Sequence, residues 1–428
     1  MIINPMIRNN ICINSHPAGC ARVVRNQIAH VTRHLAEGRD PAAAGTAAPG
    51  GSPRLVLVLG CSTGYGLASR IAAAFGYGAA TVGVSFEKAG SAAKPGTPGW
   101  YNNLAFDGEA ARAGLASKTL NGDAFSTEMK AQAAAAIRET AAQAGLAAQV
   151  DLAVYSLAAP VRRDPHTGII CRSVIKPIGR PYSGTTLDMM SGALTTASAG
   201  PATEEEIAHT VKVMGGEDWE LWIEALAAEG LLAPGARTLA YTYLGPELSW
   251  GIYKNGTIGR AKEDLERAAG SINASGRARA WVSVNKALVT RASAVIPVIS
   301  FYVSALFKVM KEKGLHEGCI EQIIRLYRDR LYSAEGVRDP AAVPVDSAGR
   351  IRMDDWEMRE DVQRETAECM GRVTADNAGT LTDAAGFRHD FLEAHGFDVE
   401  GINYDEEADP LGIETAPYKD GDEGWTKN

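Results

Sequence analysis

The sequence predicts an α/β protein built on a doubly wound parallel sheet, and three observations support that prediction. The first is the apolar run LVLVL at 55–59, a short stretch ended by glycine that is typical of a buried parallel strand. The second is the glycine-rich turn that follows it and leads into a helix-forming segment at 67–75. The third is the repetition of this alternation, which is the pattern of consecutive βαβ units. The later apolar runs lie at 80–86, 117–120 and 151–156.

Composition limits the class of protein. The chain has 428 residues, 46% of them hydrophobic, and a net charge of −8 without any Lys/Arg block, which argues against nucleic acid and anionic membrane as main partners. Its six cysteines lack C-x-x-C spacing and are typical of free thiols, so we expect neither a metal site nor a disulfide framework. No apolar run reaches the roughly eighteen residues of a membrane span, and the opening MIINPMIRNN lacks the apolar core of a signal peptide. We therefore expect a cytoplasmic protein without a stable membrane anchor.

The segment before the first buried strand is predicted to form a hairpin and a helix. Short β-like runs at 1–3 and 11–13 flank turn residues, and 20–35 carries apolar residues with helical periodicity. Residues 37–53 are rich in Ala, Gly and Pro, which predicts a flexible surface loop.

The glycine-rich turn indicates a site for a dinucleotide phosphate. Gly60, Gly64 and Gly66 let the backbone turn tightly and approach a pyrophosphate, and the N–H groups and dipole at the start of the next helix favour its negative charge. The Gly-x-x-x-Gly-x-Gly spacing is that of short-chain reductases. An ordinary β–α turn can show the same three glycines, so on this evidence alone both interpretations stay open.

The second strand bears on the choice of cofactor. It ends at Phe86 and Glu87, about twenty residues past the last glycine, where an acid can hold the adenosine ribose hydroxyls. A carboxylate there would repel a 2′-phosphate, so NADH is favoured over NADPH, although the adjacent Lys88 weakens that preference. The alternative for Glu87 is a solvated charge at a strand end.

Two more strands end at candidate ligand-binding positions. Asp123 follows the strand at 117–120, where it can contact an adenine ring, and Leu157 and Ala158 follow the strand at 151–156. Ligands bind beyond the carboxyl ends of the strands in open α/β sheets, so these residues are expected at one edge with the glycine turn. A loop is expected at 94–101, and helices at 102–114 and 126–144.

The remaining chain contributes further helices and strands. Residues 162–196 are irregular and rich in Gly, Pro and Ser, which fits either a substrate-covering insertion or a plain surface excursion. Trp219 and Trp222 share one face of a predicted helix and are expected in the core. The expected strands are 237–244 and 277–284. The expected helices are 203–214, 217–229, 301–313, 318–332, 354–372 and 384–395.

Tyr253 and Lys262 form the candidate catalytic pair. A Tyr–Lys pair after the fifth strand supplies the acid and its electrostatic helper in short-chain reductases. Nine helical steps would place the two side chains about 180° apart, so they cannot face one site from a single regular helix. Asn255-Gly256-Thr257 resolves the conflict, because Gly breaks a helix and Thr can cap the next one. Tyr253 is therefore predicted on the loop and Lys262 inside the helix, although the spacing alone is also consistent with chance.

Taken together, these features resemble the trans-2-enoyl-CoA and enoyl-acyl-carrier-protein reductases of bacteria, the long V-type enoyl reductases, over nearly the whole chain. The matching stretches are MIINPMIRNNICI, GCSTGYGLASRI, KPGTPGWYNN, NGDAFS, VYSLAAP, ATEEEIAHTVKVMGGEDWELW, TYLGPEL, IYKNGTIGRAK, LFKVMKEKGLHEGCIEQ and FLEAHGF. The resemblance implies an NADH-dependent reductase of 2-enoyl thioesters carried on CoA or acyl-carrier protein. It also implies a place at the last step of fatty-acid elongation and a chain that is usually monomeric.

The resemblance implies roles for particular residues as well. Tyr253 would be the proton donor and Tyr243 would contact the substrate. The residues implied in cofactor binding are Gly60, Cys61, Ser62, Thr63, Gly64 and Tyr65 for the pyrophosphate, Phe86 and Glu87 for the adenosine ribose, Asp123 and Ala124 for the adenine, Leu157 and Ala158 for the inner half of the cofactor, and Lys262, Leu288, Val289 and Thr290 for the nicotinamide side. The chain departs from the family pattern at 36–53, at Trp250-Gly251 and at Lys254, where an aromatic residue is common.

We predict one enlarged NAD-binding reductase domain over 1–404. Within it, the nucleotide-binding core spans 54–300, the insertion 161–235 and the C-terminal helices 301–404, and an acidic tail follows at 405–428. Two other functions stay open on the sequence: a carbonyl reductase of the short-chain type that uses NAD(P)H, and a non-catalytic NAD-binding sensor. The intact Tyr–Lys pair argues against the sensor, which has no need of both residues.

Overall fold

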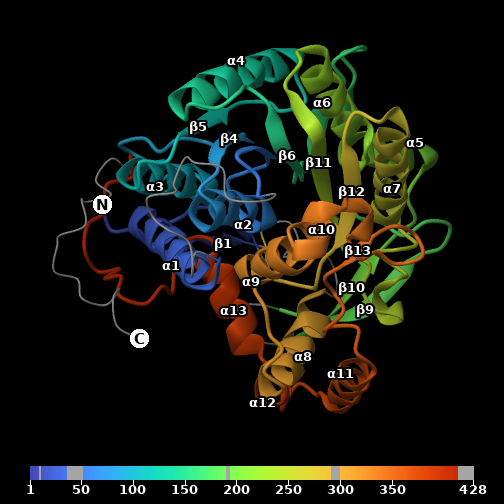
Figure 1. The fold of residues 1–428 in the computed structure, drawn as a ribbon. Helices are drawn as coiled ribbons and strands as arrows, with labels where there is room; N and C mark the ends of the chain where they lie inside the picture. Colours follow the sequence, from blue (N-terminus) through green and yellow to red (C-terminus); the bar gives the residue numbers. More distant parts are fainter. Residues whose placement is uncertain (9–10, 36–51, 189–192, 291–298, 413–428) are drawn as a thin grey trace.

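The computed structural model describes residues 1–8, 11–35, 52–188, 193–290 and 299–412, and its centre is a seven-stranded parallel sheet (Figure 1). The strand order across the sheet is β13-β12-β11-β6-β3-β4-β5. These strands are β3 (Leu55–Leu59), β4 (Ala80–Ser85), β5 (Ser117–Asn121), β6 (Val150–Tyr155), β11 (Leu232–Thr242), β12 (Arg279–Val284) and β13 (Ile351–Arg352).

The order of the strands confirms the predicted doubly wound α/β fold. From β3 the chain winds outward through β4 to β5, then returns to β6 on the other side of β3 and winds away through β11 and β12. The connections therefore diverge between β3 and β6, and a crevice for a ligand opens at the carboxyl ends of such a pair.

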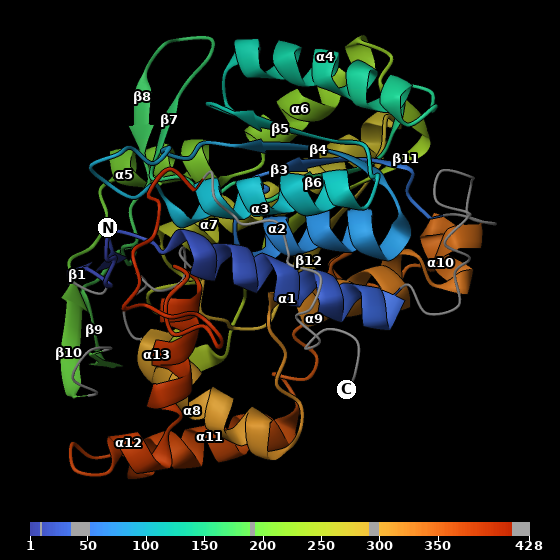
Figure 2. The same cartoon turned by 90° about the vertical axis from the view of Figure 1, so that its left-hand side faces the viewer.

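Alternating side chains of the buried strands supply two separate cores, one on each face of the sheet (Figure 2). On β3, Leu55, Leu57 and Leu59 enter the core with α4, α6 and α7, whereas Val56 and Val58 enter the core with α1, α2, α3 and α9. The helices of the first face are α4 (Thr127–Gln143), α6 (Glu217–Ala228) and α7 (Thr257–Ser275). Those of the second face are α1 (Pro17–Leu35), α2 (Gly64–Ile71) with η2 (Ala72–Gly76), α3 (Pro98–Arg112) and α9 (Cys319–Leu326) with η4 (Tyr327–Leu331).

A third core lies beyond the carboxyl edge of the sheet, where the C-terminal helices gather around α8 (Figure 1). It includes Ile3 of the N-terminal segment and Leu288, which follows β12. Its helices are α8 (Ile299–Glu312), α11 (Glu360–Arg372) and α13 (Ala384–Glu393). The predicted N-terminal hairpin is present as β1 (Ile7–Arg8) and β2 (Ile11–Cys12), but the expected strand at 1–3 is wrong, because the strand that pairs with β2 lies at 7–8. The smaller helices are η3 (Glu247–Ser249), α10 (Ala334–Arg338), η5 (Pro340–Ala342) and α12 (Ala378–Leu381).

The prediction of irregular structure over 162–196 is wrong. The segment forms two antiparallel hairpins, followed by α5 (Glu204–Met214), which begins with the expected capping box at Thr203 and Glu206. Its strands are β7 (Val161–Arg163), β8 (Ile170–Arg172), β9 (Tyr182–Leu187) and β10 (Leu194–Ala199). These strands carry mainly Thr, Ser and Arg, so they lack the apolar alternation that reveals a half-buried strand.

Other differences are small. Helix α3 begins at Pro98 rather than 102, because proline fits the first turn of a helix. Residues 36–51 of the expected surface loop lie outside the described residues, as do 413–428 of the expected tail. The described start of that tail contacts α3, where the Tyr101 hydroxyl donates to the Pro410 carbonyl. The predicted domain limits stay a prediction.

Candidate functional site

The glycine turn between β3 and α2 is packed too closely for side chains. Gly60 has φ +83°, and a Cβ built on it would lie 2.2 Å from the Ser156 carbonyl oxygen at the end of β6. A Cβ on Gly66 would lie 1.9 Å from the Gly60 carbonyl oxygen. Thr63, the N-cap residue of α2, makes no side-chain cap, so its hydroxyl leaves the first-turn N–H groups to other acceptors. This bare backbone beside a helix start fits a pyrophosphate.

Glu87 lies beside this turn. The Ser62 hydroxyl donates to the Glu87 carboxylate over 2.7 Å, which brings the end of β4 onto the turn after β3. The Asn121 side chain at the end of β5 both accepts from the Glu87 N–H and donates to its carbonyl oxygen. Gly99 leaves room for the Glu87 carboxylate, because a Cβ atom on Gly99 would lie 2.2 Å from Glu87 Oε1. Phe86 points outward and is 77% exposed.

Side chains of helices α4 and α6 hold the loop that follows β5. The Ala124 carbonyl accepts from the Trp222 indole over 3.1 Å and from the Lys130 ammonium over 3.3 Å. Lys130 is also paired with Asp218 over 2.8 Å, and burial raises the pKa of that carboxyl. Asp123 accepts the N–H of Phe125, which closes the turn. The predicted adenine-contacting residues therefore sit on an anchored loop.

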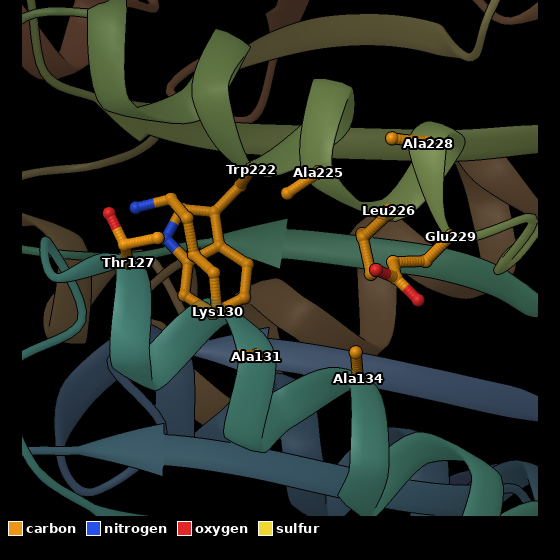
Figure 3. Close-up of a pocket in the computed structure, with 9 residues that line it drawn as sticks. All are labelled: Thr127, Lys130, Ala131, Ala134, Trp222, Ala225, Leu226, Ala228 and Glu229. Carbon is orange, nitrogen blue, oxygen red and sulfur yellow. The ribbon is translucent and has the colours of Figure 1, made fainter.

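A hollow of about 210 Å³ lies between α4 and α6, on the helix side of this loop (Figure 3). Trp222 and Lys130 lie at one end of it, Leu226 and Glu229 lie at the other, and most of the remaining lining residues are alanines. None of its lining residues is among the catalytic, substrate-binding or cofactor-binding residues predicted from the sequence. Its lining is Thr127, Lys130, Ala131, Ala134, Trp222, Ala225, Leu226, Ala228 and Glu229.

Tyr253 lies on the turn between η3 and α7, as predicted, and Lys262 lies inside α7. The predicted Thr257 cap is wrong: Gly256 is the N-cap residue, and the Thr257 hydroxyl instead donates to the Val174 carbonyl. The Tyr253 carbonyl accepts the N–H of Gly259, which ties the turn to the helix. Tyr253 and Lys262 therefore lie on two consecutive segments, a turn and a helix, and not on one continuous helix.

Burial controls the ionisation of both side chains. The Tyr253 ring is 7% exposed and packs with Ile252 and Ile258, so burial raises the pKa of its hydroxyl, which stays protonated at neutral pH. Lys262 is half-buried and donates to the Tyr241 carbonyl over 3.3 Å, and burial lowers the pKa of its ammonium to about 8. A buried hydroxyl that keeps its proton and a titratable cation therefore lie on the turn before α7 and within α7, respectively.

The insertion packs onto the Tyr253 turn. Ile175, Tyr182 and Ala199 contact the cluster formed by Tyr253 and its neighbours, which places the β9–β10 hairpin over this part of the site. The substrate-covering role of the insertion stays a prediction. Lys254, one of the departures noted in the sequence, is exposed and stacks its ammonium 3.7 Å from the centre of the Trp250 ring.

Tyr243 stands at the end of β11 with its ring edge-on to Tyr253, the ring centres 5.4 Å apart. Its hydroxyl donates to the Glu357 carboxylate over 3.1 Å. Burial and the Glu357 charge raise the pKa of Tyr243. Glu357 is fully buried, and the sequence analysis missed it, because it lies in a polar stretch where no spacing marks it.

The segment after β12 reaches the glycine turn. A Cβ on Gly64 would lie 3.8 Å from the Thr290 methyl carbon, and the Tyr65 hydroxyl donates to the Lys286 carbonyl over 3.2 Å. Leu288 is buried and packs in the third core. Leu157 follows the Ser156 carbonyl against which Gly60 packs. The structure therefore gathers the predicted residues of β3, β4, β6 and β12 at one edge.

Comparison with known proteins covers almost the whole chain. Residues 94–332 match the family model described as trans-2-enoyl-CoA reductase catalytic region, 2–92 match the NAD(P)H binding domain of trans-2-enoyl-CoA reductase, and 345–408 match the enoyl reductase FAD binding domain. The chain is 58% identical to a trans-2-enoyl-CoA reductase [NADH] of Treponema denticola over 96% of this chain and 99% of that one. It is 50% identical to an enoyl-[acyl-carrier-protein] reductase [NADH] of Chromohalobacter salexigens over 96% and 98%.

Two solved structures are similar throughout. The T. denticola trans-2-enoyl-CoA reductase in complex with NAD superposes with a TM-score of 0.88 at 58% identity, over 96% of this chain and 98% of that one. The Clostridium acetobutulicum enzyme in complex with NADH superposes with a TM-score of 0.86 at 40% identity, with the same coverage.

The segment matched as a flavin-binding domain does not fit a flavin dinucleotide. Its one described strand, β13, spans two residues and leads to a turn that carries the buried carboxylates of Asp354 and Glu357. Arg352 and Tyr302 already pair with these carboxylates. Buried negative charge would oppose the phosphates of a flavin, whereas the backbone cradle at 60–66 fits those of NADH.

Proposed function

Because this chain belongs to the trans-2-enoyl-CoA reductase family, we propose that it uses NADH to reduce the carbon–carbon double bond of trans-2-enoyl thioesters to saturated acyl thioesters. It is an oxidoreductase of fatty-acid synthesis. The observation that carries the proposal is the glycine turn and the Tyr253–Lys262 pair at one sheet edge, in a chain similar over almost its full length to NADH-dependent enoyl reductases.

We assign the cofactor residues from this geometry and from the sequence motifs. The turn from Gly60 to Tyr65 would hold the pyrophosphate, Glu87 the adenosine ribose, and Asp123 and Ala124 the adenine. Leu157 and Ala158 would line the inner half, and Lys262 with 288–290 would flank the nicotinamide. Bound NADH supplies the hydride that adds to the β-carbon of the enoyl thioester.

The protein must stabilise the charge that hydride addition places on the thioester oxygen. A donor aimed at that oxygen is needed as the enolate forms. Tyr253 is protonated over the neutral range because burial raises its pKa, so it can donate to the oxygen or complete the reduction as an acid. Lys262, with a pKa of about 8, carries positive charge at neutral pH and would hold the nicotinamide ribose. Tyr243, edge-on to Tyr253, would contact the substrate.

Oxidation of NADH with crotonyl-CoA, measured at 340 nm beside a panel of ketones, tests this function. Rapid oxidation with crotonyl-CoA and none with ketones is expected. Turnover of ketones alone would indicate a carbonyl reductase, and tight NADH binding without any turnover would indicate a sensor.

The identity of the acyl carrier, CoA or acyl-carrier protein, is a further part of the proposal. We propose that both enoyl-CoA and enoyl-acyl-carrier protein are accepted. The chain is at least 50% identical, over 96% of its length, to a relative named for each of the two carriers. Rates with one acyl chain on the two carriers would decide the preference.

The monomeric state and the cytoplasmic location stay predictions, and light scattering tests the monomeric state. In the described part of the chain, no helix is long and apolar enough to cross a bilayer.

Removing the carboxylate at the end of β4 should change cofactor choice. In the Glu87→Ser variant, the NADH-over-NADPH preference in kcat/KM should narrow by about ten- to a hundredfold, because one hydrogen bond to a charged group and its repulsion of a 2′-phosphate are both lost. Ser62→Ala, which removes the hydroxyl that donates to Glu87 but keeps the charge, should narrow it less. An unchanged ratio of kcat/KM for NADH to kcat/KM for NADPH in Glu87→Ser would mean that another group binds the adenosine ribose.

A further inference from the structure

One buried carboxylate connects the substrate side and the cofactor side of the site. Glu357 lies on the turn between β13 and α11 and is fully buried. One of its oxygens accepts from the hydroxyls of Tyr243 over 3.1 Å and Tyr302 over 2.7 Å. The other accepts the backbone N–H of Ala287 over 2.7 Å. A single side chain thus holds the end of β11, helix α8 and the segment after β12.

Each of these bonds supports a different part of the proposed machinery. The bond to Tyr243 fixes a ring that packs edge-on against Tyr253. The bond to Ala287 fixes the backbone directly before 288–290, the segment that approaches Gly64. Gln363 donates to the Tyr302 hydroxyl and to the Glu357 carbonyl, which braces the turn itself.

A buried cation lies near the Glu357 carboxylate and partly offsets the effect of its burial. Lys286 is 2% exposed, and its ammonium donates to the Ala287 carbonyl over 3.1 Å and lies 4.7 Å from the centre of the Phe307 ring. Its charge acts against the rise in the pKa of Glu357 that burial causes. Buried carboxylates persist where hydrogen bonds and a countercharge stabilise them, and removing one partner is costly.

We propose that Glu357 is a positioning residue of the reductase: it fixes Tyr243 for the enoyl thioester and fixes 287–290 for NADH. The proposal rests on the proposed function for its substrate half. It gives the C-terminal segment 345–408 a role in organising the active site through a carboxylate. The sequence did not indicate that role.

The Glu357→Gln variant tests the substrate half. The amide keeps the shape and one carbonyl oxygen, which the fixed Ala287 N–H will take, so the amide NH₂ faces Tyr243 and that hydroxyl loses its acceptor. The KM for crotonyl-CoA should rise about tenfold, while kcat falls less and the Kd for NADH, from quenching of tryptophan fluorescence, stays within about twofold. Combining Glu357→Gln with Tyr243→Phe should raise KM no further than Tyr243→Phe alone, because the carboxylate acts through that hydroxyl.

Tyr302→Phe is the matched control. It removes a second donor to the same carboxylate oxygen but leaves the Tyr243–Glu357 and Ala287–Glu357 hydrogen bonds in place. It should therefore lower the melting temperature but leave the KM for crotonyl-CoA within about twofold. A KM for Glu357→Gln no higher than that of this control, or additive effects in the double variant, would overturn the substrate half.

Glu357→Ala tests the cofactor half without any enoyl substrate. Loss of both oxygens frees the Ala287 N–H, so the Kd for NADH should rise at least about fivefold. An unchanged Kd in a folded variant would overturn that half. These binding measurements separate this proposal from the proposed function, whose failure would be seen as absence of turnover in the unaltered enzyme.

Discussion

Replacing Tyr253 with phenylalanine should lower kcat for crotonyl-CoA about a hundredfold or more and leave the affinity for NADH unchanged. The loss is that expected for one hydrogen-bond donor to a developing oxyanion in a site from which water is excluded. The ring is packed on Ile252 and Ile258, and no hydrogen bond of the Tyr253 hydroxyl to a described residue is seen, so removing the oxygen should leave the turn intact. Stopped-flow turnover and fluorescence titration of NADH measure the two quantities separately.

The Tyr243→Phe variant tests which of the two tyrosines donates the hydrogen bond to the substrate oxygen. Tyr243 donates to Glu357, so its hydroxyl is engaged within the protein, and its loss should mainly raise KM. A near-normal kcat in Tyr253→Phe together with a collapsed kcat in Tyr243→Phe would mean that the two tyrosines have been assigned the wrong way round.

The parts of the fold that the sequence predicted well are those whose signal is local. Strand β3 was predicted to the residue, because five apolar residues between a charged residue and a glycine have few other stable conformations. The positions of Gly60 and Glu87 near strand ends follow from the same signal, because each comes within two residues of a buried strand, whereas their roles toward the cofactor stay predictions. The hairpins β7–β8 and β9–β10 were missed because their stability comes from cross-strand pairing and not from an apolar repeat.

The supporting part of the site depends on contacts that are distant in sequence. Glu357 contacts Tyr243 and Ala287, which are 114 and 70 residues away in the sequence, and no property of its own neighbours distinguishes it from the other acidic residues around it. The turn position of Tyr253 and the helical position of Lys262 could be predicted because Gly256 signals the break between them, whereas their catalytic roles stay a prediction. A single sequence can therefore identify groups placed by one strand or one helix, whereas a buried carboxylate shared by three elements appears only when the topology is known.

Replacing Lys262 with methionine should weaken NADH binding about tenfold and lower turnover as well, which distinguishes it from the Tyr253 variant. Methionine keeps the length and apolar stem of the side chain, so the half-buried position stays filled while the ammonium is lost. One charge-assisted hydrogen bond accounts for a change of that size. Arg260→Met removes a cation from the exposed side of the same helix and should leave both quantities within about twofold.

The pH dependence of kcat/KM tests whether the charge of the Lys262 ammonium is required. The folded protein lowers the pKa of Lys262 to about 8, and the side chain is charged below that value and neutral above it. If the charge is required, kcat/KM of the free enzyme should be level at neutral pH and fall as the pH rises through about 8. Lys262→Arg, whose guanidinium stays charged over this range, should lose that decline even if its geometry makes it slower. A decline that persists unchanged in Lys262→Arg would show that another group titrates, and Lys262 would then act through its hydrogen bond and not through its charge.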